Sequence, residues 1–530
     1  MHAPYRTIRS IALLASFLTS LQAYDAYSRT YLATHTPFDT LSPECISLFH
    51  NRKAVRKNGR EGAGQITFFG GKTTRPHVIA QYFLPNGKDT IIVGEDASNA
   101  AVSRTRDVNA AYFDIVTANV WTDAELQADF THLTFESQVQ FCPKQKLYGI
   151  GIAWQQQLTD SFWFDITIPI VQIKNNLGMC EKIFNKGGSC QECTYEDITW
   201  KNSFISGACQ SSNGRCYGNM TNKWLKKTRV SHIDIRGGLD TECMNDCAAL
   251  SGYVGVMIPT GNKPCNLWLF EPIVGDSHLG LEFGTWLSFK LMDDKTHSLT
   301  TYLSGMTRYL LPNNQYRSFD LRGKPWSRYM WVWTDNNNGQ AATLVDALQD
   351  KRDYLINYST LCVNVKPHYS YEVNSALDYK YKGFHAEVGF NFYGKKAEEI
   401  CFTHAMNNAI GLEAVRRFID TPHIPATRSE STISSPLFKL SSIMGTADDI
   451  VNTTGANDTS TYVPLTTDYL DPLSGAQPEI MSQTLYGTLA YAWDNIKFPV
   501  LLSGGASYEF SHGNAAVSRW IGWLKFGISI

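Results

Sequence analysis

The sequence predicts an all-β protein, a transmembrane antiparallel β-barrel of about fourteen strands, with twelve or sixteen as alternatives. Three observations lead to this fold class. Beyond its N-terminus, the chain of 530 residues has no apolar stretch long enough for a helical span. Most of the chain after about residue 130 alternates between apolar and polar residues in long segments. The connections between these segments are either tight or long, as in outer-membrane barrels.

The first residues are typical of an export signal. Arg6 and Arg9 precede an apolar run, Ile11–Leu21, and the small residue Ala23 follows. A positive start, a short apolar run and a small residue at the cut define a secretory signal peptide. A membrane anchor is the alternative, but the run is shorter than a span. We therefore expect residues 1–23 to be a signal peptide, which places the protein outside the cytoplasm.

Residues 24–60 lack the alternating pattern and contain a basic group of residues, Lys53, Arg56, Lys57 and Arg60. We expect this region to be an N-terminal periplasmic extension or a plug inside the lumen. The barrel itself is expected to occupy residues 61–530.

The alternation is clearest in the segment Ser277–Leu291. Leu279, Leu281 and Phe283 begin an apolar face, while Gly280 and Glu282 begin a polar one. A globular strand has about 5–6 residues and a tilted membrane strand needs about 9–11. The length of this segment favours a membrane strand with its apolar face toward lipid. A secreted soluble sandwich has the same alternation and is the alternative fold.

Counting backward from a periplasmic C-terminus gives twelve strands whose long connections all fall outside. Two further apolar segments, near 64–72 and 109–118, raise the expected number to fourteen. The expected long outer loops include a Cys-rich loop at 175–227 and a loop at 396–479, which opens with a helical stretch near 397–419. The twelve predicted strands are 130–142, 146–158, 161–174, 228–239, 249–261, 277–292, 296–310, 367–381, 384–395, 480–494, 497–511 and 516–530.

The chain contains 12 cysteines, and eight of them lie between Cys180 and Cys265. In an exported protein, such clusters usually form disulfides. We expect most of them to fold an outer loop, and Cys243 and Cys247 to lie in a periplasmic turn; a zinc site and free thiols are the alternatives. The disulfide candidates are Cys180, Cys190, Cys193, Cys209, Cys216, Cys243, Cys247 and Cys265.

Charged residues occur on the polar faces of the predicted strands. A charge on the lipid face costs about 2–4 kcal/mol at mid-membrane, so these residues are expected to line the lumen. They could brace the interior as paired charges, or create a field that selects solutes. No metal or other cofactor is implied. The predicted lumen-lining residues are Asp165, Asp234, Arg236, Glu282, Lys290, Arg308, Glu372, Asp378, Lys380, Glu387, Glu509, Arg519 and Lys525.

No sequence motif indicates catalysis or nucleic-acid binding. The stretch Phe69–Thr73 ends like a phosphate-binding loop, but Ile66 stands where the first glycine belongs. The chain has 47 Lys and Arg against 49 Asp and Glu, whereas nucleic-acid surfaces are strongly basic. A Ser/His hydrolase remains an alternative, with His232, His278, His297 and His385 on or beside strands.

The mature chain resembles Gram-negative outer-membrane β-barrel proteins, although it ends in Ile530 where many of them end in Phe. Three stretches are similar to uncharacterised barrel proteins of intracellular bacteria: Ile258–Pro264, Arg317–Arg328 and Val388–Tyr393. A looser likeness is to the long-chain fatty-acid transporters, which implies fourteen strands and an N-terminal hatch. The charged lumen differs from the apolar binding pocket of those transporters.

Together these patterns predict a bacterial outer-membrane channel or transporter that passes small solutes through a polar, charge-lined lumen. One alternative is a plugged barrel that displays or binds through a disulfide-stapled outer loop, and the other is an outer-membrane hydrolase. The expected partners are outer-membrane lipid and small solutes, without nucleic acid. No residue pattern identifies a subunit interface.

Overall fold

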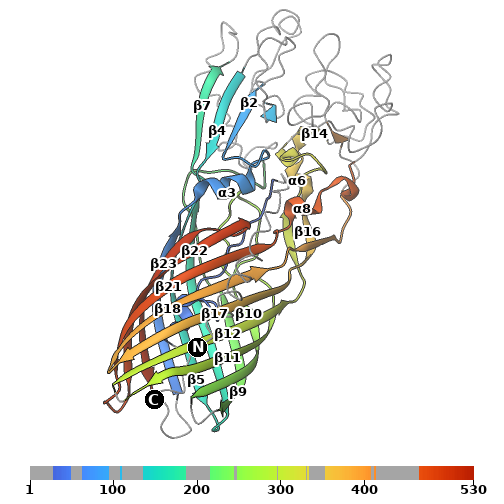
Figure 1. The fold of residues 1–530 in the computed structure, drawn as a ribbon. Helices are drawn as coiled ribbons and strands as arrows, with labels where there is room; N and C mark the ends of the chain where they lie inside the picture. The colour runs from blue at the N-terminus through green and yellow to red at the C-terminus, as the bar shows by residue number, and fades with distance from the viewer. Residues whose placement is uncertain are drawn as a thin grey trace, which may run out of the picture.

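The structure is a computed structural model, and it describes residues 28–48, 62–94, 108–109, 135–186, 215–243, 247–294, 296–329, 331–333, 352–406, 411–412 and 465–530. Twelve antiparallel strands in these ranges close into a barrel (Figure 1). Each strand pairs with its neighbour in the following order, and the last pairs with the first: β1 (Gly62–Thr73), β5 (Lys144–Gln157), β6 (Phe162–Asn176), β9 (His232–Cys243), β10 (Ala248–Pro259), β11 (Gly280–Asp293), β12 (His297–Leu310), β17 (His368–Tyr381), β18 (Phe384–Lys395), β21 (Ile480–Trp493), β22 (Val500–Asn514) and β23 (Arg519–Ser529).

The number of wall strands is twelve in the described part of the chain, one of the two alternatives to the expected fourteen. A further strand, β8 (Leu225–Val230), pairs only with β6, and Ser231 separates it from β9. The predicted antiparallel barrel is therefore confirmed as a fold class, and the count of fourteen is not.

The predicted strand 130–142 does not belong to the barrel. Its described part, β4 (Phe135–Phe141), lies in a separate sheet of order β3-β2-β4-β7, with β2 (Thr90–Gly94), β3 (Val108–Asn109) and β7 (Met179–Lys186). The segment near 64–72 takes its place, as β1 between β5 and β23. Alternation identified both as strands, but β4 pairs with β2 and β7, whereas β1 pairs with β5 and β23 of the wall.

The two faces of the wall differ in exposure because side chains alternate along a strand. Leu485 and Leu489 of β21 point outward and are more than half exposed, while Thr484 and Thr488 are buried. Apolar residues outside and polar residues inside are the pattern of a membrane barrel. Among the described residues, no helix is both long and apolar enough to cross a bilayer.

Antiparallel pairing places the strand connections alternately at the two ends of the barrel. One end carries 158–161, 244–247, 294–296, 382–383 and 494–499, and the other carries 74–143, 177–231, 260–279, 311–367, 396–479 and 515–518. The described parts of this second set lie beyond the barrel end in Figure 1, and we call them the cap. The cap consists of the β3-β2-β4-β7 sheet, α3 (Pro76–Phe83), β13 (Asn313–Ser318), η6 (Ser327–Tyr329), β14 (Trp331–Trp333), β15 (Arg352–Tyr354), α6 (Ile356–Ser359), β16 (Thr360–Lys366), β19 (Glu399–Phe402), β20 (Gly411–Leu412), η9 (Thr467–Tyr469) and α8 (Pro472–Gly475), with the loops that join them.

The cap has its own apolar interior. One cluster contains Phe83, Phe141 and Trp326, and another contains Phe319 and Val363. The helical stretch expected near 397–419 is wrong at its start, because Glu399–Phe402 pairs with β16 as strand β19. Cross-strand pairing in the cap overrides the local helical preference of this charged segment.

Inward-facing glycines allow bulky rings to lie flat against the inner wall. A Cβ atom on Gly284, Gly389 or Gly505 would fall within 2.6 Å of a ring on the neighbouring strand. A Cβ atom on Gly151 would instead meet the ring of Phe38, which does not belong to the wall. The space left by these glycines is therefore filled by aromatic side chains.

Candidate functional site

The inside of the barrel contains residues 28–48, which we call the inner segment. All of them are buried except Arg29, Thr34, Thr36 and Leu48. The only helix in the segment is the four-residue α2 (Pro43–Ile46), which lies near β1, β22 and β23. The inner segment is thus an irregular chain surrounded by the wall and the cap.

The upper part of the inner segment is anchored in the cap. The Arg328 guanidinium donates to Asp320 at 2.6 Å and to the Ser28 hydroxyl at 3.0 Å. The Arg317 guanidinium lies 3.5 Å from the centre of the Tyr31 ring, a cation–π distance. Burial raises the pKa of the Tyr31 phenol, so the ring stays neutral beside this cation. Two buried arginines therefore fix this part of the segment.

The middle of the inner segment is anchored to the wall by Arg308 of β12. Two nitrogens of its guanidinium donate to the two carboxylate oxygens of Asp39, at 2.8 and 2.7 Å. Its Nε donates to Glu282 of β11 at 2.7 Å. All three side chains are buried, so this bidentate pair joins segment and wall in a region without bulk water.

The lower part is held through its backbone, because an irregular chain cannot satisfy its own peptide groups. The Lys525 ammonium donates to the carbonyls of Cys45 and Ser47, at 3.0 and 2.6 Å. The Glu387 carboxylate accepts the Leu48 N–H at 2.8 Å. Wall side chains thus supply the hydrogen bonds that secondary structure would otherwise supply.

Apolar contacts accompany these polar ones. Phe38 stacks on Phe69 of β1 with ring centroids 5.9 Å apart. Leu41 and Ile46 belong to a buried cluster with four wall residues: Trp163, Tyr253, Trp286 and Met306. The segment fits the wall by shape as well as by charge.

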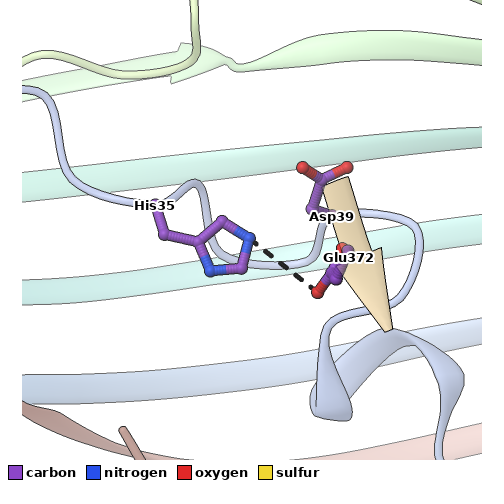
Figure 2. A group of neighbouring side chains, drawn as sticks. All are labelled: His35, Asp39 and Glu372. Carbon is purple, nitrogen blue, oxygen red and sulfur yellow. Dashed lines mark ion pairs between the residues drawn. The ribbon is translucent and has the colours of Figure 1, made fainter. Parts of the chain in front are cut away.

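Titratable side chains gather around Asp39 in two groups that could hold a metal ion. One is His35, Asp39 and Glu372 (Figure 2), and the other is Asp39, His232 and Asp234. In each group, one ligand atom per residue lies within 4.8 Å of the others. His35 Nε2 lies 4.0 Å from Glu372 Oε1, and His232 Nε2 lies 3.2 Å from Asp234 Oδ2.

Eleven of the thirteen predicted lumen-lining residues are buried on the inner face of the wall, since only Lys290 and Lys380 of that set are not. Those two lie near the short connections, where they pair with Asp293 and Asp494. Further ion pairs join Arg236 to Asp165 at 2.7 Å, Arg519 to Glu509 at 2.6 Å, and His385 to Asp378 at 3.1 Å.

Sequence reasoning named Arg308, Glu387 and Lys525 among the wall residues that connect to the inner segment, but it missed several others and the inner-segment residues themselves. His35 and Asp39 lie in a region without a strand pattern, and Gln65 and Asn391 are uncharged. Gln65 donates to the Cys45 carbonyl and Asn391 to the Leu41 carbonyl, each at 2.9 Å. The only available signal was the position of Asn391 in the alternation of its strand, which predicts an inward side chain.

The cysteine prediction is open. Cys190, Cys193 and Cys209 lie outside the described residues, as do the side-chain contacts of Cys243. Cys180 and Cys265 lie on the cap side, and Cys247 lies exposed beside a short connection; none of these three is bridged in the structure. Cys142, which was not a candidate, lies beside β7, where its N–H donates to the Gly178 carbonyl at 3.1 Å.

The closed wall and its apolar outer face define the class of the protein. In a bilayer, only helices and closed barrels satisfy their backbone groups, and a barrel that is apolar outside belongs in a bacterial outer membrane. The protein is therefore an outer-membrane β-barrel.

Comparison with known proteins adds the following. No family model matches the chain, and no curated protein matches its sequence. Among solved structures, an outer membrane channel from Pseudomonas putida F1 is similar, with 8% identity, 90% of this chain and 97% of that chain covered, and a TM-score of 0.36. The transport unit of the autotransporter AIDA-I from Escherichia coli is also similar, with 7% identity, 91% of this chain and 93% of that chain covered, and a TM-score of 0.30. The toluene transporter from Ralstonia pickettii has 7% identity, with 96% of this chain and 98% of that chain covered, and a TM-score of 0.28. The resemblance to barrel proteins of intracellular bacteria stays a prediction.

Proposed function

We propose that this protein is an outer-membrane channel for small solutes in which the inner segment is a displaceable plug. The observation that carries the proposal is the position of residues 28–48, buried along the lumen and held by contacts such as the Asp39–Arg308 pair. The state described above is then the closed state, and the channel opens when the segment leaves.

The type of contact supports a segment that can move without unfolding the wall. β1 pairs on both sides with other wall strands, β5 and β23, so barrel closure does not depend on the inner segment. The segment makes no strand pairing with the wall, and its hydrogen bonds to the described wall residues run through wall side chains such as Arg308 and Lys525. Side-chain contacts can be replaced by water one at a time, whereas a sheet ladder cannot.

The charges of the wall indicate what an open lumen would pass. The seven predicted acids and six predicted bases nearly balance, so a lumen lined by them would discriminate weakly between anions and cations. The proposed substrates are therefore small polar solutes selected chiefly by size.

Conductance in planar bilayers tests the proposal. The mature chain is compared with a variant lacking residues 24–60, and heat-dependent gel mobility verifies that both are folded. We expect little conductance from the intact chain and steady conductance after the deletion. Steady open conductance from the intact chain would show that the inner segment does not block the lumen.

A second candidate function is a permanently closed barrel that displays its cap. It is favoured by the apolar interior of the cap, where Trp326 donates through its Nε1 to the Phe83 carbonyl at 2.8 Å. If both chains are folded and neither conducts in the bilayer experiment, this function is supported. The Cys-rich region 175–227 would then be the displayed part.

The hydrolase alternative has one arrangement to support it. The Ser231 hydroxyl lies 3.0 Å from His232 Nδ1, and His232 Nε2 lies 3.2 Å from Asp234. A nucleophile must reach its substrate, however, and Ser231 has an exposed fraction of 0%. We therefore rank hydrolysis below the other two functions.

A further inference from the structure

Glu372 of β17 is a buried carboxylate without a strong cationic partner. Its exposed fraction is 0%, and its Oε1 accepts one hydrogen bond, from the Asn391 amide at 2.8 Å. Within the described residues, its Oε2 has no hydrogen-bond partner. A buried carboxylate of this kind costs several kcal/mol unless a cation or a proton neutralises it.

The nearest arginine does not provide that cation. Arg308 directs its guanidinium to Asp39 and Glu282, and its closest further carboxylate is Asp234, at 3.8 Å. Among the described side chains, Arg308 thus forms ion pairs with Asp39, Asp234 and Glu282, and not with Glu372.

His35 faces Glu372 with a nitrogen that lacks a partner. Its Nε2 makes no hydrogen bond within the described part of the chain, and its side chain is 7% exposed. The Nε2–Oε1 separation of 4.0 Å is too long for a hydrogen bond (Figure 2). Two ligand atoms of one tetrahedral zinc ion, each bonded at 2.0–2.2 Å, lie about 3.4 Å apart, so Nε2 and Oε1 would have to approach by roughly 0.6 Å to share an ion.

The surroundings hold these ligands in place. The Tyr393 ring stacks on the His35 imidazole with centroids 3.8 Å apart, and Asn391 orients the Glu372 carboxylate. Asp39 is oriented by Arg308, and a carboxylate oxygen can accept from a guanidinium and still bind an ion. Partners that orient ligands in this way are a regular feature of metal sites.

The second group around Asp39 is less suitable. His232 Nε2 already lies 3.2 Å from Asp234, and the Ser231 hydroxyl lies 3.0 Å from its Nδ1. An ion there would have to separate His232 from Asp234, whereas His35 Nε2 and Glu372 Oε2 have no hydrogen-bond partner among the described residues.

We propose that His35, Asp39 and Glu372 bind one divalent transition-metal ion, with Zn²⁺ as the best-fitting probe. One imidazole nitrogen and two carboxylates suit zinc, and three protein ligands leave a position for water. Two ligands come from the inner segment and one from β17, so the ion ties the segment to the wall. This inference stands whether or not the barrel opens.

Zinc binding by the folded, full-length mature protein in detergent tests the site. After chelator treatment and dialysis against Zn²⁺, metal content is measured for the wild type, His35→Gln, Glu372→Gln and the control His385→Gln. His385 is a wall histidine that pairs with Asp378, away from the proposed ligands. We expect about one zinc per chain in the wild type and the control, and at least a tenfold loss of affinity in the other two.

A second readout separates a metal ligand from a structural residue. Zinc should raise the unfolding temperature of the wild type and of His385→Gln, and leave that of Glu372→Gln unchanged. Glu372→Gln also removes the buried charge, so without metal it should fold and be at least as stable as the metal-free wild type. Absence of zinc from the folded wild type, or equal zinc in all four proteins, would overturn the proposal. The first result would mean that a proton neutralises Glu372, and the second that zinc binds elsewhere.

Discussion

The outer and inner faces of the same twelve strands follow different rules. Outward residues such as Leu485 and Leu489 need only be apolar, since lipid makes no specific contacts with them. Inward residues such as Arg308 and Lys525 each have a particular partner in the inner segment. The outer face is therefore specified by a pattern and the inner face by individual pairs, and substitutions on the two faces should differ accordingly.

The largest effect is expected on the inner face, at Arg308. Arg308→Met leaves Asp39 and Glu282 buried without their guanidinium, which should cost about 3–5 kcal/mol of unfolding free energy. Arg308→Lys keeps the charge but loses the bidentate geometry, and should cost less. Urea titration followed by heat-dependent gel mobility measures both. Equal stability of the methionine variant and the wild type would mean that the inner pairs are replaceable.

A charge on the outer face should cost slightly less and depend on depth. Leu485→Arg, near the middle of β21, should lose about 2–4 kcal/mol in phospholipid vesicles. Trp493→Arg, at the end of the same strand, should lose about 0–1 kcal/mol. Equal losses at the two positions would contradict the placement of β21 across the membrane.

A single methyl group should distinguish the two faces more finely. In Gly151→Ala, the new Cβ would lie 2.3 Å from the Phe38 ring, so the inner segment must shift, at a cost of about 1–3 kcal/mol. In Gly252→Ala, nothing lies within 4 Å, and the change should stay within about 0.5 kcal/mol. If the segment is a plug, only Gly151→Ala should raise conductance in planar bilayers.

The smallest effect is expected in the cap, where Asp276 accepts from Lys395 at 2.7 Å. Burial raises the pKa of Asp276, but the Lys395 ammonium and His278 outweigh it and hold the pKa below its ordinary 3.8. The pair therefore contributes stability above about pH 3.8, and this contribution is lost as the pH falls through the lowered pKa. Asp276→Asn should remove roughly 1–2 kcal/mol at neutral pH and nothing in strong acid. Hydrogen exchange of cap amides at both pH values measures the difference.

Much of the wall could be predicted, because alternation and length are local properties of the sequence. The strands from Lys144 to Ser529 fall where the pattern placed them, within a few residues. The error at 130–142 arose because alternation marks a strand without saying which sheet it joins.

The candidate site could not be predicted, because its contacts join distant parts of the chain. Asp39 and Arg308 are 269 positions apart, and neither residue indicates the other. Parity placed Glu372 on the inner face, but nothing near it in the sequence points to His35. The position of an irregular segment depends on side chains that no periodicity relates.

The pairing of β1 with β23 also sets an order of events in assembly. Ala63 lies opposite Ser529, so the wall cannot close until β23 has been made and brought back to β1. The inner segment precedes β1 and lies inside the finished ring, so it must be in place, or find its way in, before this seam forms. Contacts between chain ends form slowly, which leaves the unclosed edges of β1 and β23 exposed to incorrect pairing. A mistimed closure would trap an empty ring with its buried carboxylates unmatched.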